Sequence, residues 1–453
     1  MTVAGLATQA FKGTGLEVDF PSSSHRSYAI SNKRPEEEPQ APSESCLRSR
    51  PASVSGSRIQ HLGLPNFLAD VGRHEQGIEL SLTDAVALAM LAASRGVKCP
   101  WQIKAAFLVY ALGFVISTLT VSWNLASMFY GWQVVRTIIV FYAVARASVT
   151  DTRVPEALLT GLIVGITSQA LFAAYEFAGG NIQAGGSFGH QNLLGMMTHF
   201  IVYPAFALFL AGYHVKRTAL ALVAGLIVAY TGGSRATIGL MAVGLVMTLI
   251  VSSHHRLNGR KMAVAVATLL SLAAVTPILY SAIERRSVEQ RGGSSEERER
   301  MKVAASMIIS DNPLGAGANR YVTVSNVGGY TSRAGVAWTS SAAPVHSTFY
   351  LVTAEMGWIG LIGFVTILLA GLVKSRQASK RASGTLHGEY ATGLAVTFVM
   401  VAIHSQYEWI TMLYLVHIPI AFSLGIVAAG AARAKKAGPV AERSRALIGS
   451  DLR

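Results

Sequence analysis

Long apolar runs separated by short polar connections extend along the chain from about Leu80 to Ala431. The runs are roughly 17 to 25 residues long, the length that an α-helix needs to cross a hydrocarbon core about 30 Å thick. Stretches such as 103–121 and 361–373 are apolar on every helical face, whereas the strands of a membrane barrel would alternate apolar and polar residues. The pattern therefore predicts an all-α fold, a polytopic bundle of transmembrane helices.

The apolar runs and their polar ends define about 10 to 12 helices within residues 80–431. We expect them at residues 80–94, 103–123, 127–146, 156–177, 193–212, 218–232, 236–252, 262–280, 347–373, 390–404 and 409–431. A long connection, residues 281–346, interrupts the series. Within its segment 296–310, apolar residues recur at helical spacing, and Asp311-Asn312-Pro313 then ends the helix. These apolar residues are Met301, Ala304, Ala305, Met307 and Ile308. The spacing predicts an amphipathic helix that lies on the membrane surface.

Basic residues occupy alternate connections between the predicted helices. They cluster at residues 95–104, 146–153, 216–217, 256–261 and 374–381, and in the tail 432–453. The connections of opposite parity contain almost no Lys or Arg, and they are residues 124–127, 179–192 and 404–408. Because cytoplasmic connections carry the excess of positive charge in membrane proteins, we expect the first group and the basic tail to be cytoplasmic. The second group, the turn 232–235 and the loop 281–346 are then extracytoplasmic.

The composition indicates a membrane protein and excludes other classes. Hydrophobic residues make up 51% of the chain and charged residues 14%, which leaves too little polar surface to dissolve a globular fold of this length. The formal net charge of +14 does not indicate a nucleic acid partner, because Lys and Arg lie between apolar runs and do not form one patch. Cys46 and Cys99 are too few for a disulfide framework or a zinc cluster. The sequence contains no HExxH motif and no P-loop, so we expect no metal and no cofactor.

Residues 1–75 differ from the rest of the chain. Pro, Ser, Glu and Arg dominate around 34–57, with no apolar run and no signal-peptide core. This composition is typical of a disordered polar segment. An incorrectly assigned start site that replaces a true first helix is the alternative interpretation.

The long outward loop holds the richest cluster of guanidinium groups in the sequence. Its basic residues are Arg285, Arg286, Arg291, Arg298, Arg300, Lys302, Arg320 and Arg333. Arg298 and Lys302 stand four residues apart on the polar face of the predicted amphipathic helix, so one anionic group could meet both. Solubility and contact with lipid headgroups are the alternative explanation for these residues.

Arg235 interrupts two apolar runs at a Gly-Gly-Ser turn. A guanidinium group that loses its water there costs several kcal/mol unless it is paired, which makes Arg235 a candidate functional residue. The alternative is an arginine that only reaches to the outer interface. Arg136, inside a predicted helix, is a weaker candidate, because an interhelical pair with Glu176 or Glu355 explains it equally well.

Further polar side chains stand at the outer ends of two predicted helices. His346 begins the helix after the long loop, and an imidazole can gain or lose a proton near neutral pH. Tyr350, one turn further, shares the face of His346, whereas Glu355 points roughly the opposite way. His190 and Asn192 end a glycine-rich turn, where Asn192 could cap the next helix and His190 has no such explanation. A structural role is the alternative for His346.

Four motifs follow one another along the chain. They are GSFGHQN before a helix, GGSRATIGL in an interrupted helix pair, RERMKVAASMIISDNPLGAG in the outward loop and VHSTFYLVTAEMGWIGL after it. In this order and with this sidedness, residues 80–431 resemble the O-antigen ligase and polysaccharide polymerase superfamily. The resemblance implies a multi-pass enzyme of the bacterial inner membrane that moves a glycan from an undecaprenyl pyrophosphate donor. The acceptor would be a hydroxyl of lipid A core or of a growing polysaccharide, on the periplasmic or outer face, without a metal or a nucleotide sugar.

The resemblance also implies roles for single residues. Arg235 and Arg298 are similar to the motif arginines of the family, and His346 to its motif histidine, so these three are the expected catalytic residues. Two positions depart from the family: Lys302 stands where an aromatic residue is usual, and Ser347 replaces the more common Asn. The expected substrate-binding residues are His190, Asn192, Arg300, Lys302, Arg320 and Tyr350.

The chemistry of this transfer agrees with these residue types. Cleavage of the bond between sugar C1 and pyrophosphate develops negative charge on the phosphate, which guanidinium groups stabilise through charge-assisted hydrogen bonds. A neutral histidine can take the proton of the acceptor hydroxyl. A ligase and a polymerase share this donor, so both stay open. A flippase or secondary transporter for an anionic lipid or glycan is the alternative class, and a structural scaffold for an envelope assembly is a third.

Overall fold

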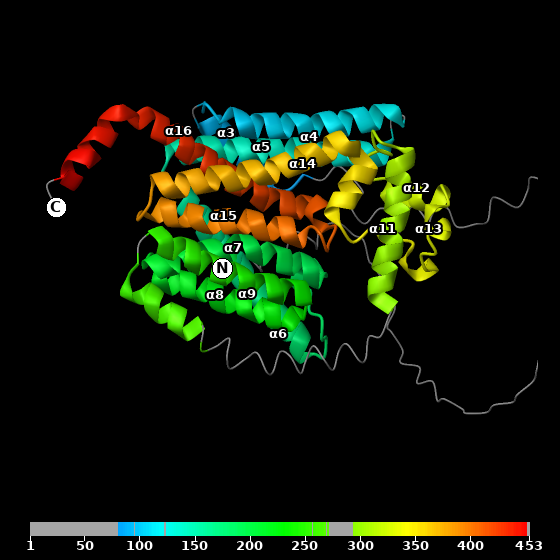
Figure 1. Cartoon of the computed structure of the whole chain (residues 1–453), viewed down its shortest axis with the longest axis horizontal. Coiled ribbons are helices and arrows are strands. Elements are labelled where there is room, and N and C mark those ends of the chain that lie inside the picture. The colour runs from blue at the N-terminus through cyan, green and yellow to red at the C-terminus, as the bar shows by residue number, and fades with distance from the viewer. Residues whose placement is uncertain are drawn as a thin grey trace, which may run out of the picture. The chain divides into compact units, whose positions relative to one another are not determined.

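A computed structural model describes residues 80–94, 96–121, 124–255, 257–268, 270 and 293–450. Within these residues all regular secondary structure is helical. Nine of the described helices are long and apolar enough to cross a membrane, and Figure 1 shows long helices running side by side. The prediction of a polytopic helical bundle is therefore confirmed. The segment 1–75, which we expected to be disordered, lies outside the described residues.

The candidate membrane spans match the predicted apolar runs. They are α4 (Trp101–Thr120), α5 (Leu125–Thr150), α6 (Val154–Ala178), α7 (Gln191–Ala211), α8 (Val215–Gly232), α9 (Arg235–His255), α14 (Thr348–Arg381), α15 (Leu386–His404) and α16 (Tyr414–Ser450). The last helix begins five residues later than expected, after a 3-10 turn, and continues through most of the predicted basic tail. The helix predicted at 262–280 lies mostly outside the described residues.

Shorter elements complete the described part of the chain. They are α3 (Leu82–Ala93), η2 (Gly186–Phe188), α11 (Gly293–Asp311), α12 (Tyr321–Val327), α13 (Tyr330–Arg333), η3 (Trp338–Ser340) and η4 (Ile410–Met412). Helices α11 to α13 belong to the long loop and gather at one end of the helices in Figure 1. The amphipathic helix predicted at 296–310 is thus present as α11.

The long helices pack closely around α7 and α14. Helix α14 contacts α4 and α15, α7 contacts α8 and α15, and α16 contacts α5. A Cβ atom at Gly113 would lie 2.4 Å from the backbone nitrogen of Gly360, so glycine at this crossing allows α4 and α14 to meet backbone to backbone. Helix α7 is the most enclosed of the candidate spans, with 89% of its apolar window buried. Its first turn begins with the half-buried Gln191 and Asn192 and continues with the buried Leu193 and Leu194.

The connections predicted to be extracytoplasmic meet at one end of the bundle. The hydroxyl of Ser127 donates to the carbonyl of Ala318 at 2.8 Å, which joins the 124–127 turn to the long loop. The backbone nitrogen of Ala184 donates to the carbonyl of Thr231 at 3.2 Å, which joins the 179–192 connection to the end of α8. The parity of the connections therefore predicted correctly which of them share an end.

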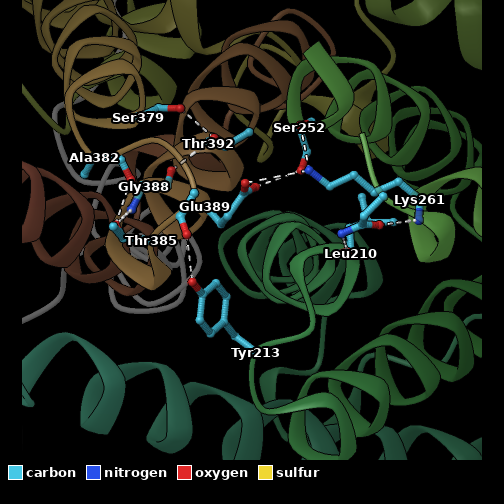
Figure 2. A network of polar contacts seen from close by, with 12 residues as sticks. Leu210, Tyr213, Ser252, Lys261, Ser379, Ala382, Thr385, Gly388, Glu389 and Thr392 are labelled. Carbon is cyan, nitrogen blue, oxygen red and sulfur yellow. Dashed lines mark hydrogen bonds and ion pairs between the residues drawn. The ribbon is translucent and has the colours of Figure 1, made fainter. Parts of the chain in front are cut away.

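At the opposite end of the bundle, a buried ion pair joins the basic connection 256–261 to the start of α15 (Figure 2). The Nζ atom of Lys261 lies 3.7 Å from the Glu389 carboxylate, and both side chains are almost fully buried. Ser252 on α9 donates its hydroxyl to Glu389 at 2.7 Å and accepts from Lys261 Nζ at 2.7 Å through its carbonyl. Each charge is therefore satisfied, as burial requires. The pair ties α9 and the segment after it to α15.

A second buried ion pair corrects one expectation. Arg136 on α5 binds Asp84 on α3 through two hydrogen bonds, from Nε at 2.9 Å and from Nη2 at 2.6 Å. The predicted partners Glu176 and Glu355 were wrong, because the short helix α3 packs against α5 and brings Asp84 to the guanidinium. Tyr414 completes the pair, with its ring centroid 3.7 Å from the guanidinium carbon. Arg136 is thus a structural residue.

Helix α14 breaks at Gly357, which the sequence pattern did not reveal. Its φ of +67° and ψ of −173° lie outside the helical region, in a conformation that favours glycine. A Cβ atom at this position would lie 2.5 Å from the carbonyl carbon of Leu314. The break allows the 313–315 turn of the long loop to lie directly against α14, where Trp358 N donates to Pro313 O at 3.3 Å.

The apolar face of α11 packs against protein, which corrects the prediction that it rests on the membrane surface. Met301, Ala304, Ala305 and Ile308 are all at most 3% exposed. The helix contacts α14, α12 and α13. The 3.6-residue spacing predicted the buried face correctly, but it could not distinguish a protein partner from lipid, because both are apolar. The bundle thereby holds the polar face of α11 in a defined orientation.

Candidate functional site

A buried carboxylate, that of Glu408, holds together the polar residues at the end of the bundle where α11 lies. Its side chain is 2% exposed. Asn192 Nδ2 donates to it at 2.7 Å, Arg298 Nη2 lies 3.3 Å from it, and His346 Nδ1 lies 3.3 Å from its second oxygen. These four residues, which we call the Glu408 cluster, come from α7, α11, the end of the long loop and the turn after α15. A carboxylate that is buried away from solvent needs such hydrogen-bond partners.

Local backbone hydrogen bonds place Glu408 beside His346. The chain turns after α15, and Glu408 N donates to His404 O at 3.1 Å. Thr348, the first residue of α14, donates to the carbonyl of Glu408 from its nitrogen at 3.0 Å and from its hydroxyl at 2.7 Å. The start of α14 is therefore hydrogen-bonded to the turn after α15, which fixes the position of the His346 ring relative to the carboxylate.

The Glu408 contact also determines which nitrogen of His346 is available. A carboxylate accepts hydrogen bonds, so the imidazole donates through Nδ1. In the neutral ring the lone pair is then on Nε2. The His346 side chain is 24% exposed, so part of it is accessible from outside the protein. Such a ring can accept a proton at Nε2 while the carboxylate stabilises the resulting charge. As the sequence predicted, Glu355 is not the partner of His346. The Glu355 carboxylate instead accepts from Tyr321 N at 3.0 Å.

The first turn of α7 reverses the expected roles of His190 and Asn192. His190 is the N-cap, and its Nδ1 accepts from Leu193 N at 3.4 Å. Asn192 was expected to cap the helix and instead donates to Glu408. Burial lowers the pKa of His190, the charge of Glu408 opposes that effect, and the nearby His346 adds to it. His190 is therefore held as a neutral ring at the edge of the Glu408 cluster.

Arg298 is the only basic residue of the described part of α11 that contacts the Glu408 cluster. Its Nη1 donates to Tyr407 O at 3.4 Å, next to the Nη2 contact with Glu408. The side chain is 37% exposed, and a guanidinium carries five N–H donors, so donors are left for an anionic ligand. Lys302, four residues further along α11, pairs with Glu299 at 2.7 Å.

Arg235 begins α9 at the same end of the bundle. The chain reverses at Gly233, whose φ is +58°, and the Arg235 side chain is exposed. The preceding glycine, Gly232, packs beside Gln191, so the turn lies against the first turn of α7. Asn192, on that same turn, binds Glu408. Arg235 and the Glu408 cluster thus border the same helix end.

Comparison with known proteins identifies this part of the chain. Residues 220–365 match the family described as O-antigen ligase. Over these residues the chain is similar to an O-antigen ligase domain. The match confirms the resemblance over residues 220–365, which contain Arg235, Arg298, His346 and three of the four motifs; the motif GSFGHQN lies before this segment. A search of curated proteins finds no significant match to the chain.

Three further candidate residues, Arg300, Arg320 and Tyr350, lie at the same end of the bundle as the Glu408 cluster. Arg300 pairs with Glu296 at 2.6 Å and donates to Gly335 O at 3.0 Å, so it faces the long loop. Arg320 precedes α12 and is half-buried. Tyr350 is half-buried and packs against the hydrophobic core one turn after His346. The structure therefore places these three residues at the same end of the bundle as the cluster, but not inside it.

Sequence reasoning missed Glu408, although one signal was available. It is the single acidic residue in the short connections predicted to face outward, which are 124–127, 179–192, 232–235 and 404–408. A lone carboxylate in connections that otherwise avoid charge indicates a specific partner. Glu408 also lies outside the segment that matches the O-antigen ligase family.

Proposed function

We propose that this protein transfers a glycan from an undecaprenyl-pyrophosphate-linked donor to an acceptor hydroxyl, on the outer face of the bacterial inner membrane. The observation that carries the proposal is the Glu408 cluster, in which one buried carboxylate holds a partly exposed guanidinium and a partly exposed imidazole next to each other. The O-antigen ligase match supports a lipid-linked donor and a polysaccharide acceptor. The basic connections at the opposite end of the bundle support the outward orientation.

The two arginines act on the leaving group in this proposal. As the bond between sugar C1 and the pyrophosphate oxygen breaks, that oxygen keeps the electron pair and becomes negatively charged. Arg298 is oriented by Glu408 and Tyr407 and offers its remaining N–H groups to the phosphate. Arg235 is exposed at the neighbouring turn and contributes a second guanidinium. Donors that are fixed before the reaction lose little free energy to reorganisation when the charge develops.

His346 acts on the acceptor. Its Nε2 takes the proton of the acceptor hydroxyl while the hydroxyl oxygen attacks C1, so that one C–O bond forms as the other breaks. Glu408 accepts from Nδ1 throughout and stabilises the imidazolium that results. Direct displacement of this kind inverts the configuration of the anomeric carbon.

The residues around the Glu408 cluster form the proposed substrate-binding surface. Arg300, Lys302, Arg320 and Tyr350 offer donors and an aromatic ring to the donor glycan or the acceptor, and His190 borders the imidazole of His346. Asn192 has a different role, because its amide is already bound to Glu408. It supports the carboxylate rather than a sugar.

Surface glycans from a deletion strain test the proposal. Loss of long polymer with single repeat units retained indicates a polymerase, whereas loss of attachment to lipid A alone indicates a ligase. Complementation with wild-type protein should restore the glycan profile, and complementation with His346→Ala should not. His214→Ala, at the opposite end of the bundle, is the matched control and should restore it. An unchanged profile in the deletion strain would contradict the proposed function.

A further inference from the structure

An apolar groove runs between α14 and α15, which lie side by side in Figure 1. Its volume is about 230 Å³. It is lined by Phe349, Val365, Leu368, Leu369, Leu372, Phe398, Val399, Ala402 and Ile403. All of these side chains are hydrophobic, so the lining offers no hydrogen bond to a sugar or a phosphate. The groove therefore suits a hydrocarbon ligand.

The groove begins next to the Glu408 cluster. Phe349 lies three residues after His346 and follows Thr348, which binds the backbone of Glu408. Ile403 lies five residues before Glu408, at the end of α15. From Ile403 to Phe398 the groove follows α15 for about 7 Å, at roughly 1.5 Å of helix per residue. It thus leads from the cluster into the membrane-spanning part of the two helices.

One side of the groove is open. Leu369 is 52% exposed and Ile403 is 37% exposed, whereas Phe398 and Leu368 are buried and form the floor. Both α14 and α15 are candidate membrane spans, so this open side faces hydrocarbon. A lipid chain can therefore enter sideways from the bilayer.

We infer that this groove binds the part of the donor's carrier chain that is nearest its pyrophosphate. The inference rests on the proposed function, which supplies the lipid-linked donor. A chain that enters at Phe349 and Ile403 leaves its pyrophosphate at the end of the groove where Arg298 and His346 lie. The volume is below the roughly 300 to 1,000 Å³ of pockets that enclose a whole drug-sized ligand, so only a first segment of the chain is held. The groove positions the donor along the membrane normal.

Filling the groove tests this inference without relying on catalysis. Ala402→Trp places an indole in the groove, and Ala242→Trp, at an exposed position on α9, is the matched control. Native mass spectrometry of the purified full-length protein measures retention of undecaprenyl phosphate, with phosphatidylglycerol as the competing lipid. We expect Ala402→Trp to weaken retention of undecaprenyl phosphate roughly tenfold. Ala242→Trp should leave it unchanged. Ala402→Leu, a milder change that the fold tolerates more easily, should give an intermediate loss.

Kinetics then separate the groove from the active site. With the full-length donor, Ala402→Trp should raise KM about tenfold and leave kcat near the wild-type value. With the same glycan pyrophosphate capped by a methyl group, the variant should match wild type, because this donor has no chain to place in the groove.

Two results would overturn the inference. One is equal retention of undecaprenyl phosphate by wild type and Ala402→Trp. The other is equal loss of phosphatidylglycerol and undecaprenyl phosphate, which would make the groove a general lipid site. Absence of transfer by the wild-type protein, with the retention difference present, would reject the proposed reaction and leave the lipid site in place.

Discussion

Glu408 is the residue on which the positions of His346 and Arg298 depend. Both side chains are partly exposed and would adopt several rotamers in water, and each is held by the same buried carboxylate. A substitution of Glu408 by Gln removes the charge but keeps the shape of the side chain, so it tests this dependence without leaving a cavity. Glu408 touches no substrate in the proposed mechanism, so it is a positioning residue.

Glu408→Gln should lower kcat about 10- to 100-fold and change KM by no more than about twofold, since the imidazolium of His346 loses its stabilising charge. Glu408→Asp keeps the charge on a shorter side chain and should recover part of the rate. The measurement is steady-state transfer by purified variants whose thermal stability matches that of wild type. A loss that appears in KM alone would assign Glu408 to substrate binding instead.

Arg235 provides a test of geometry against charge. Lys keeps the charge but loses the paired donors of the planar guanidinium, so Arg235→Lys should impair transfer strongly and Arg235→Ala more so. Loss of a charge-assisted contact at the leaving group costs on the order of 2–4 kcal/mol, or roughly thirty-fold to a thousand-fold in rate.

Arg217→Lys, an exposed substitution at the opposite end of the bundle, is the control for this comparison and should transfer at the wild-type rate. Arg235 would be only an interfacial anchor if Arg235→Lys also kept the wild-type rate, since an anchor needs the charge alone.

Residue types and register predicted part of the Glu408 cluster. His346 and Asn192 stood out because each is polar at an outward helix end, and Arg298 because it lies on the polar face of the predicted amphipathic helix. Glu408 did not, because its importance comes from contacts with residues 62 to 216 positions away, which a single sequence does not encode as a pattern. The exchange of roles between His190 and Asn192 has the same cause. Capping depends on neighbouring residues, whereas the hydrogen bond from Asn192 to Glu408 joins residues that are distant in the sequence.

At the scale of elements, hydrophobic run length predicted the helices and missed the break in α14. Gly357 lies inside the segment predicted as one helix, 347–373, and glycine is common in membrane-spanning helices, so the residue itself does not mark an interruption. The break depends on a distant segment, the 313–315 turn, which lies directly against it. The same limit applies to α11, whose buried face was predicted but whose covering partner was not.

Gly357→Ala should destabilise the protein by about 1–3 kcal/mol, because alanine disfavours the positive φ and its Cβ would meet the backbone of Leu314. Gly161→Ala is the matched control inside α6, where a Cβ meets no atom within 4 Å. This substitution should leave stability unchanged or raise it slightly. The measurement is the apparent unfolding temperature in detergent, and equal values for the two variants would show that the break is not required.

At the scale of the whole molecule, charge parity predicted which connections share an end of the bundle, because the positive-inside bias acts on each connection separately. The long loop 281–346 was assigned through its neighbours alone. Its contacts with the 124–127 and 404–408 connections place its described part at the same end. Which face of the membrane that end occupies is a prediction.

Cysteine labelling tests this orientation. In a background with Cys46 and Cys99 replaced by Ala, Ser332→Cys lies on an exposed position of the long loop and Ser383→Cys on an exposed position at the basic end. A membrane-impermeant maleimide should label Ser332→Cys in intact spheroplasts and Ser383→Cys only after lysis. The reverse pattern would place the Glu408 cluster in the cytoplasm and contradict the proposed mechanism.

The most direct test of the central claim is transfer by the purified protein in proteoliposomes, from an undecaprenyl-pyrophosphate-linked glycan to an acceptor hydroxyl. Wild-type protein should form the glycosidic product, and His346→Ala should lower the rate about 100-fold or more, because the acceptor loses its general base. His214→Ala should match wild type. A wild-type rate from His346→Ala would contradict the account of the Glu408 cluster as the catalytic site.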